Sequence, residues 1–192
     1  MRTEIDATID DVCRLLERSR EANYIGESVS QLAHGLQAAH FAARAGADDA
    51  HILAALFHDV GHLCAEKDAE RMDALGILNH EQIGAQYLYD RGFSTTVCTL
   101  VAQHVEAKRY QVFSRPHYRA NLSEASVGTL AFQGGPMTAL EAESFEKHPL
   151  FKGILAVRQW DEMAKVADLD VPDLPHYRPR MRAHLLAQSG SG

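Results

Sequence analysis

The sequence has few of the residues that mark several common classes of protein. Only three cysteines occur among 192 residues, Cys13, Cys64 and Cys98, and no two of them form a CxxC pair. This odd number argues against a disulfide scaffold or a cysteine metal site, and it favours a reducing, cytoplasmic location. No apolar run approaches the roughly 18 residues that a membrane span needs, and the first residues lack the apolar segment of a secretory signal. We therefore expect no membrane partner.

Basic residues are also scarce, with 19 Lys and Arg against 26 Asp and Glu, for a net charge of -7. Because nucleic-acid binding needs a basic face, we expect no nucleic-acid partner. The 46% apolar content is enough to bury a core. These values predict one domain over residues 1–192, with its core at about 24–165 and a frayed tail at 186–192.

Apolar residues recur at helical spacing through almost the whole chain, and alternating strand patterns are absent. The fold class expected is therefore all-α, a helical bundle with a metal site in its core. Helix-start and helix-stop residues give the expected boundaries. The helices run from Thr8 to near Ser19, from Ser28 or Ser30 to Gly46, from Asp48 to near Gly61, from Asn79 to Gly92, from Ser94 through His104, from Ser123 to Gly134, briefly from Thr138, over 151–166, and after Pro175.

Histidine is the residue in excess: there are 11, against six Tyr and seven Phe, and over half of them fall between His34 and His80. Six side chains that could bind a metal lie on five of the expected helices, as in the metal sites of helical bundles. They are His34, His58, Asp59, His80, His104 and Asp161.

The adjacent pair His58 and Asp59 is the strongest of these signals. It follows the apolar run 52–57, so both side chains are expected at the end of a buried helix. Burying such groups is unfavourable unless something binds them. A metal ion is one solution and a buried ion pair is the other.

The order His34, His58-Asp59, Asp161 resembles the H…HD…D pattern of the HD-domain superfamily. His80 and His104, placed between, resemble its six-ligand version, which holds two metals. The stretches NYIGESVSQLAHGLQ, FHDVGH, NHEQIGAQYL, HVEAKRY, FQGGPM and VRQWDE are similar to the PhnZ/TmpB family of di-iron HD-domain oxygenases. Ligand types alone suit Fe, Mn or Zn equally.

The resemblance implies two iron ions in a mixed Fe(II)/Fe(III) working state, bridged by Asp59, with O2 as co-substrate. His34, His58 and Asp161 would complete one iron, and His80 and His104 would serve the other. Tyr24 would bind the second iron until the substrate displaces it, and Glu27 would face the substrate's ammonium group. Without the resemblance, Tyr24 is a packing residue and Glu27 an acid that favours a helix N-terminus.

The substrate implied is a small hydroxyphosphonate, whose anionic end needs a local cluster of donors. His62, Lys108 and Arg158 each lie about one helical turn from a proposed ligand. For His62 this requires the helix to continue through Gly61. Ser126 adds a hydroxyl. The alternatives are a solvated helix end for Lys108 and a surface ion pair with Glu162 for Arg158.

The resemblance implies dioxygenase cleavage of the C–P bond. The first choice of substrate is (R)-1-hydroxy-2-(trimethylammonio)ethylphosphonate, giving glycine betaine and phosphate. The second is 2-amino-1-hydroxyethylphosphonate, giving glycine and phosphate. Asn23, beside Tyr24, is neutral where the primary-amine enzymes are expected to carry an acid, which favours the methylated substrate. The rivals are a metal-dependent HD phosphohydrolase acting on nucleotides and a non-enzymatic HD domain; the six intact ligand positions argue against the latter.

Overall fold

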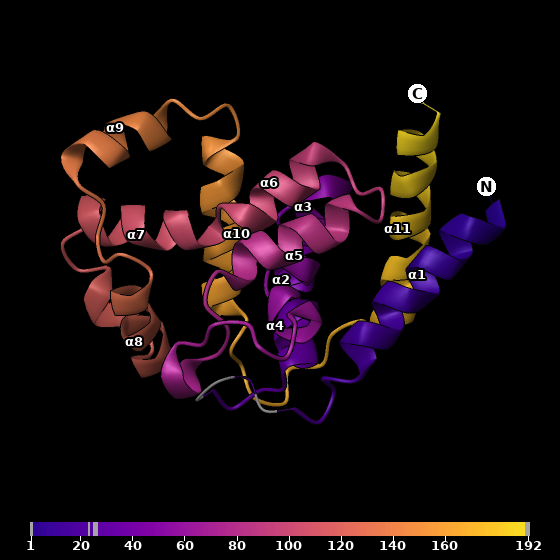
Figure 1. Ribbon diagram of the computed structural model, residues 1–192, viewed down its shortest axis with the longest axis horizontal. Coiled ribbons are helices and arrows are strands. Elements are labelled where there is room, and N and C mark those ends of the chain that lie inside the picture. The colour runs from indigo at the N-terminus through magenta and orange to yellow at the C-terminus, as the bar shows by residue number, and fades with distance from the viewer. Residues whose placement is uncertain (1, 23, 25–26, 191–192) are drawn as a thin grey trace.

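The computed structural model describes residues 2–22, 24 and 27–190, and confirms the all-α prediction (Figure 1). Within that part of the chain no strand is assigned, and Arg71 and Ile77 form an isolated bridge. The α-helices are α1 (Arg2–Glu17), α2 (Gln31–Arg44), α3 (Asp49–Phe57), α4 (Gly61–Cys64), α5 (His80–Tyr89), α6 (Thr95–Ala102), α7 (His104–Ser114), α8 (Glu124–Phe132), α9 (Ala139–Glu146), α10 (Phe151–Met163) and α11 (Leu174–Ser189). Two short 3-10 helices are η1 (Asp73–Leu75) and η2 (Arg119–Asn121).

Most of the expected helix starts are confirmed by their caps. In each, a side-chain oxygen accepts a hydrogen bond from a backbone N–H of the first turn, which would otherwise be unsatisfied. These residues are Ser30, Asp48, Ser94, Ser123 and Thr138. Asn79 precedes α5 as expected, but its backbone is left-handed (φ 58°) and its side chain makes no capping bond.

Four expected boundaries were wrong. The first helix begins at Arg2 instead of Thr8. The helix from Ser94 ends at Ala102, and Gln103 (φ -104°, ψ 1°) separates it from α7, so His104 begins a helix instead of lying late in one. The helix from Asp48 ends at Phe57 instead of near Gly61. The tail is helical as far as Ser189, because buried Leu185 anchors the last turns of α11; residues 191–192 lie outside the described residues.

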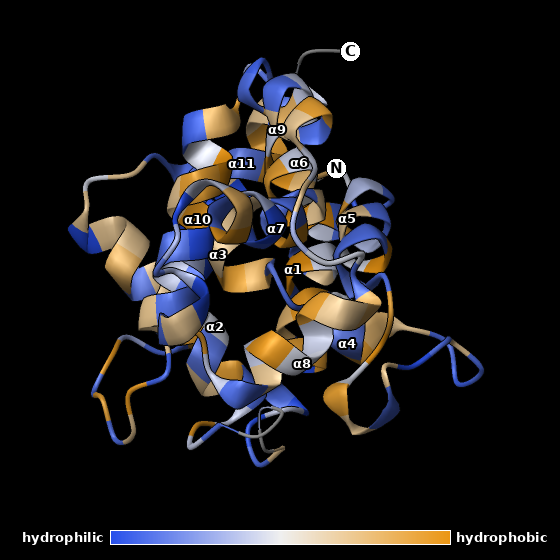
Figure 2. Cartoon of the chain, turned by 90° about the vertical axis from the view of Figure 1, so that its left-hand side faces the viewer, coloured by the Kyte–Doolittle hydropathy of each residue, from blue (hydrophilic) through white to orange (hydrophobic). Residues whose placement is uncertain are grey.

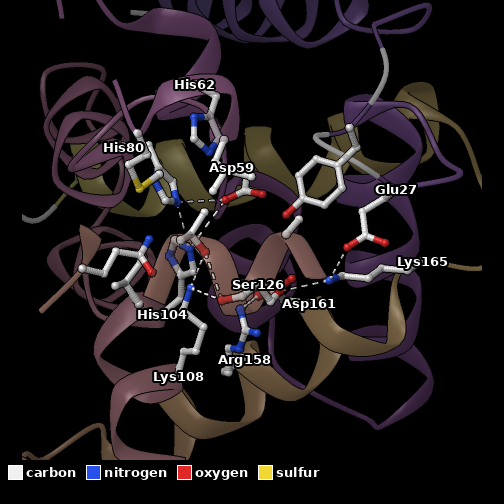
Figure 3. A pocket seen from close by; sticks show the side chains of 17 residues that line it. Glu27, Asp59, His62, His80, His104, Lys108, Ser126, Arg158, Asp161 and Lys165 are labelled. Atoms are coloured by element: carbon white, nitrogen blue, oxygen red, sulfur yellow. Dashed lines mark hydrogen bonds and ion pairs between the residues drawn. The ribbon is translucent and has the colours of Figure 1, made fainter. Parts of the chain in front are cut away.

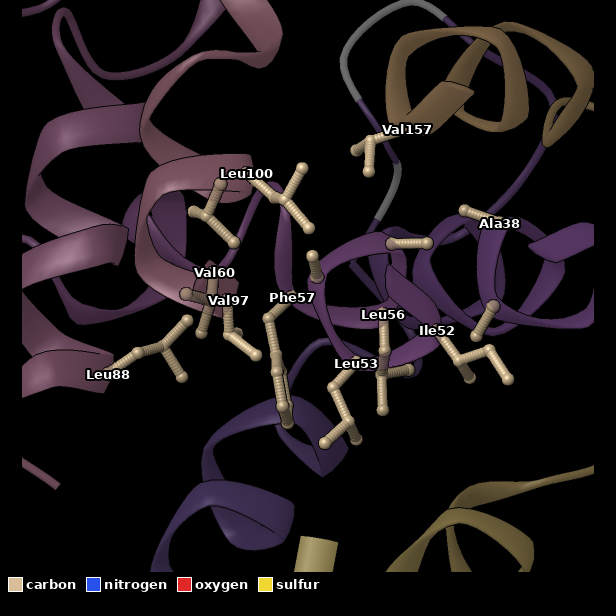
Figure 4. Packing of buried hydrophobic residues seen from close by; sticks show 14 of the residues in the cluster. Ala38, Ile52, Leu53, Leu56, Phe57, Val60, Leu88, Val97, Leu100 and Val157 are labelled. Carbon is tan, nitrogen blue, oxygen red and sulfur yellow. The ribbon is translucent and has the colours of Figure 1, made fainter. Parts of the chain in front are cut away.

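Helix α3 lies at the centre of the fold. Residues 52–57 are all buried, and the helix packs against α2, α6, α10 and α11. A helix that is apolar on every side is stable only when other helices surround it. Figure 4 shows Phe57 and Leu53 of α3 packed near Val97 and Leu88. This position carries the chain that follows α3, beginning with His58 and Asp59, into the interior.

The surrounding helices are two-sided: Figure 2 shows hydrophilic and hydrophobic residues on the same helices. Helices α1 and α11, from opposite ends of the chain, lie side by side (Figure 1). Among the described helices, none combines the length and the apolar character that a membrane crossing requires.

Helices α4 and α5 approach each other more closely than side chains would allow. A Cβ atom built on Gly61 would lie 1.8 Å from the His80 carbonyl oxygen, and one on Gly84 would lie 2.9 Å from the Gly61 nitrogen. Two glycines therefore face each other at the crossing. Their contact brings His62 of α4 against His80 of α5, where the rings stack with centroids 4.0 Å apart.

We predict that Gly61→Ala will destabilise the protein by about 2–4 kcal/mol, because the new methyl group forces α4 and α5 apart. Gly190→Ala is the matched control: it caps α11 with φ -93°, and the nearest atom to its Cβ is 3.8 Å away. The control should change stability by less than about 0.5 kcal/mol. Urea unfolding followed by circular dichroism measures both, and equal stability of the two variants would contradict the close crossing.

Candidate metal centre

The structure brings all six predicted metal ligands together in the interior, each less than one-tenth exposed. They come from separate elements: His34 from the middle of α2, His58 and Asp59 from the turn after α3, His80 and His104 from the first residues of α5 and α7, and Asp161 from α10.

Hydrogen bonds to the backbone fix the orientation of all four imidazoles. A carbonyl oxygen can only accept, so each Nδ1 that contacts one must carry the proton, and the opposite Nε2 is left with a lone pair. The four Nδ1–H groups donate to the carbonyls of Ala164 (from His34, 2.8 Å), Ala55 (from His58, 2.8 Å), Ile77 (from His80, 3.2 Å) and Val101 (from His104, 2.8 Å). This arrangement of a bare inner nitrogen and an anchored outer one is usual for metal-binding histidines.

The Nε2 atoms of His34 and His58 form one group with two carboxylate oxygens. They lie 3.0 Å apart. Asp161 Oδ1 is 3.2 Å from the first and 3.7 Å from the second. Asp59 Oδ2 is 3.7 Å from the first and 3.5 Å from the second. Two ligands bound at a right angle to a metal, with bonds of about 2.1 Å, lie about 3.0 Å apart. The spacing of this group therefore fits one metal ion.

The other oxygen of Asp59 faces a second group. Its Oδ1 lies 3.2 Å from His80 Nε2 and 3.5 Å from His104 Nε2, and these two nitrogens are 3.2 Å apart. Asp59 thus presents one oxygen to each pair of histidines (Figure 3 shows the second group). That is the arrangement of a carboxylate bridging two ions.

Unpartnered atoms in this cluster support the same conclusion. Asp59 Oδ2 and Asp161 Oδ1 are buried and accept no hydrogen bond. Although burial opposes ionisation, the charges of His58 on Asp59 and of Arg158 on Asp161 hold the pKa of both carboxyls well below the usual range. Burial favours neutral His58, but the two carboxylates outweigh it and raise its pKa to about 9. The proton on His58 therefore balances part of this negative charge, and a metal ion bound there would displace it. The residues fit two metal ions.

His62 lies beside this centre and is a weaker candidate ligand. Its ligand atom falls within 4.8 Å of those of Asp59 and His80. Its Nδ1, however, accepts a hydrogen bond from the Ile77 N–H at 3.1 Å, so the proton of the neutral ring is on Nε2. Burial and the charge of His80 lower its pKa to about 3, which keeps it neutral. His62 was expected to reach the site only if the helix before it continued through Gly61. That expectation was wrong, because α3 ends at Phe57 and the separate helix α4 brings His62 to the cavity.

The predicted phosphonate contacts Lys108, Ser126 and Arg158 line the same cavity. Lys108 is buried and donates to Thr129 Oγ1 at 2.8 Å, so it is not a solvated helix end. Burial, together with the charge of Arg158, lowers its pKa to about 7. Arg158 is equally buried: it donates to Asp161 Oδ2 and to Glu162 Oε1, and its Nη2 has no partner.

Tyr24 and Glu27 close one side of the cavity. The Tyr24 ring stacks on His34 with centroids 4.0 Å apart. Burial and the carboxylates of Asp59 and Asp161 raise the pKa of Tyr24 well above 10. The Glu27 N–H donates to the Tyr24 carbonyl at 2.7 Å, which ties the two residues in one turn. The third predicted residue of this segment, Asn23, lies outside the described residues.

Lys165 is a residue of the site that sequence reasoning missed. Its Nζ donates to Glu27 Oε1 at 2.9 Å and to Ser126 Oγ at 3.3 Å (Figure 3), and also to Ser123 Oγ at 3.1 Å. Although burial acts against it, hydrogen bonds from Ser123 and Lys165 and the lysine charge lower the pKa of Glu27. The sequence offered one signal for this lysine, since it lies four residues, about one helical turn, after Asp161.

Thr129 and Gln133 were also missed. Both line the cavity on α8 or just after it, and Gln133 Oε1 is buried without a partner. They lie about one and two helical turns after Ser126, so helical spacing could have found them. Together with the ligands they line one cavity of about 450 Å³, a volume that includes the part open to solvent.

Comparisons with known proteins identify a matching family and relatives of this chain. A sequence model of the HD domain matches residues 31–139. An uncharacterized protein of Acanthamoeba polyphaga mimivirus is 39% identical over 95% of this chain and 84% of its own length. The [1-hydroxy-2-(trimethylamino)ethyl]phosphonate dioxygenase (glycine-betaine-forming) of Leisingera caerulea is 40% identical over 88% of this chain and 85% of its own length. The hydroxymethylphosphonate dioxygenase of Gimesia maris is 39% identical over 85% of this chain and 81% of its own length.

We predict that Asp59→Ala will leave less than about 10% of the wild-type metal content after desalting, because it removes an oxygen from both groups at once. Asp68→Ala makes the same chemical change at an exposed position and should load metal as the wild type does. Atomic emission spectrometry measures the content. A full complement of metal in Asp59→Ala would contradict the shared role of this carboxylate.

Proposed function

The chain belongs to the HD-domain family, and from this premise we propose that it is a di-iron dioxygenase that cleaves the C–P bond of a small hydroxyphosphonate. The observation that carries the proposal is the position of Asp59, with one oxygen toward each pair of bare imidazole nitrogens, beside a cluster of cationic donors. A nucleotide phosphohydrolase would also use metals, but it gives no role to Tyr24 or Glu27.

The proposed substrate is (R)-1-hydroxy-2-(trimethylammonio)ethylphosphonate, converted with O2 to glycine betaine and phosphate. The name of the Leisingera caerulea relative supports this choice. A carboxylate in the cavity that faces none of the imidazoles, Glu27, supports it too, because a quaternary ammonium group has no N–H donor and is attracted by charge alone.

The metals proposed are two iron ions, in a working Fe(II)/Fe(III) state. His34, His58 and Asp161 would hold one and His80 and His104 the other, with Asp59 shared. Bound iron supplies the redox chemistry with O2 that no side chain can perform. The three free cysteines fit a reducing compartment, and we place the enzyme in the cytoplasm.

The phosphonate would be held by donors that line the cavity. His62 offers Nε2–H because its Nδ1 already accepts a bond. Arg158 offers Nη2–H, which has no other partner. Lys108 and the Ser126 hydroxyl complete this subsite. Two or three charge-assisted bonds fix the orientation of a tetrahedral anion and direct its carbon toward the centre.

Tyr24 and Glu27 would act in the same cavity. The Tyr24 hydroxyl is buried beside Asp59 and Asp161, and burial and these two charges hold its proton in place. Cations held by the same carboxylates would offset their charges and so favour the phenolate. Because Glu27 shares a turn with Tyr24, a substrate that binds Glu27 also bears on the position of the tyrosine.

Hydroxymethylphosphonate is the second candidate substrate. The Gimesia maris relative is named for it. Glu27 is also paired with Lys165 in the structure, and a substrate without a charged substituent would leave that ion pair intact. The primary-amine compound 2-amino-1-hydroxyethylphosphonate is the third.

Turnover of these three compounds at equal concentration tests the proposal. We expect O2 uptake equimolar with phosphate release, with a kcat/KM for the trimethylammonium compound at least about tenfold above the other two. Faster turnover of another compound would correct the substrate; phosphate release from nucleotides without O2 uptake would favour the phosphohydrolase. Partly oxidised protein loaded anaerobically with Fe(II) should give a mixed-valence signal in low-temperature EPR, and its absence under every redox treatment would contradict the di-iron centre.

We predict that kcat/KM for the hydroxyphosphonate will fall as the pH rises through the pKa of Lys108, about 7 in the ligand-free protein. Below that pKa the side chain is an ammonium that attracts the anion, and above it the charge is lost. Lys108→Arg should lower kcat/KM about tenfold but remove this limb, because a guanidinium stays charged over the whole range. A pH profile with the same limb in the arginine variant would assign the titration to another group.

A further inference from the structure

We propose that Lys165 competes with the cationic end of the substrate for Glu27, and that this competition sets the selectivity between cationic and uncharged hydroxyphosphonates. The inference rests on the proposed function and deepens it, since it concerns the same cavity.

Each N–H donor of the Lys165 ammonium has an acceptor within hydrogen-bond distance. An ammonium group has three N–H donors, and the three acceptors within reach are Glu27 Oε1, Ser123 Oγ and Ser126 Oγ, at 2.9, 3.1 and 3.3 Å. The Lys165 and Glu27 side chains are only 16% and 12% exposed, so water screens their attraction little. The charge of Glu27 is therefore already balanced by that of Lys165.

A cationic substituent has no other carboxylate to use. The acidic residues that line the cavity in the described structure are Glu27, Asp59 and Asp161, and the last two face the histidines. A trimethylammonium group placed against Glu27 would lie beside the Lys165 charge, and like charges at short range repel strongly where little water is present. Binding of the cation therefore requires Lys165 to leave Glu27.

The phosphonate of the same substrate offers Lys165 a new partner. Lys165 lines the same cavity as Lys108 and Arg158, and it already contacts Ser126, which belongs to the proposed phosphonate subsite. From its place beside Ser126, Lys165 can attract the phosphonate of either ligand. Only a cationic substrate also requires Lys165 to give up Glu27, whereas an uncharged hydroxyphosphonate leaves that ion pair in place.

Binding measurements on metal-loaded protein without O2 test this directly. The dissociation constants of hydroxymethylphosphonate and of the trimethylammonium compound are measured by calorimetry, and their ratio is compared among variants. Any contact that Lys165 makes with the phosphonate contributes to both ligands and cancels in the ratio. The ratio therefore reports the competition at Glu27 and not a general loss of structure.

In Lys165→Met the ratio should rise at least about tenfold in favour of the cationic ligand, because Glu27 is no longer paired. Lys165→Gln, which can still hydrogen-bond to Ser123 and Ser126, should show the same rise and serves if the methionine variant folds poorly. Glu27→Gln should lower the ratio below that of the wild type. Lys152→Met, which removes an exposed lysine of α10 outside the cavity, should leave it unchanged.

The possible failures are distinguishable. If the wild type bound neither ligand, the proposed function would fail, and this inference with it. If the wild type bound both ligands but the ratio in the Lys165 variants stayed within about twofold of the wild-type value, the competition alone would be refuted.

Discussion

The carboxylate of Asp59 is the group on which the rest of the site depends. Its two oxygens face four imidazole nitrogens at 3.2–3.7 Å, and those imidazoles come from four different parts of the chain. A buried carboxylate in contact with bare nitrogens is unfavourable unless protons or metal cations lie between them. The same interaction therefore favours a cation at this place and, because its two oxygens face different histidine pairs, it fits the proposal of two metal ions.

The scaffold prepares this centre through the ends of its helices. The last carbonyls of a helix have no partner inside the helix, and two histidines use them: His58 donates to Ala55 at the end of α3, and His104 donates to Val101 at the end of α6. The break at Gln103 therefore matters for the site, because it starts a new helix at His104 and leaves the Val101 carbonyl within reach of the His104 ring. Apolar α3 fixes the depth of the site, and the helix ends fix the directions of its nitrogens.

The sequence predicted which side chains gather at the site better than it predicted the geometry that holds them. His34, His58, Asp59 and Asp161 follow from residue order, and the caps at Ser30 and Asp48 follow from local hydrogen bonding, which depends on neighbours in the chain. The left-handed Asn79 and the break at Gln103 depend on tertiary packing, which no local pattern encodes. Lys165 was missed because α10 ends at Met163, so its contacts with Glu27 and Ser123 arise only when distant segments meet.

The balance of charge in the cavity explains how an acidic protein can hold an anion. Among the residues that the structure describes, Arg158 is paired with Asp161 and Lys165 with Glu27, so two of the three basic side chains that line the cavity already have a carboxylate partner, and Lys108 does not. Metal ions on Asp59 and Asp161 would neutralise these carboxylates and weaken the claim of Asp161 on Arg158. The donors Arg158 and Lys108 then face a site of net positive charge, to which a phosphonate dianion is attracted. On the proposed function, this electrostatic balance favours metal binding before substrate binding, and under the proposed competition the charge of the substrate's other end determines whether Lys165 leaves Glu27.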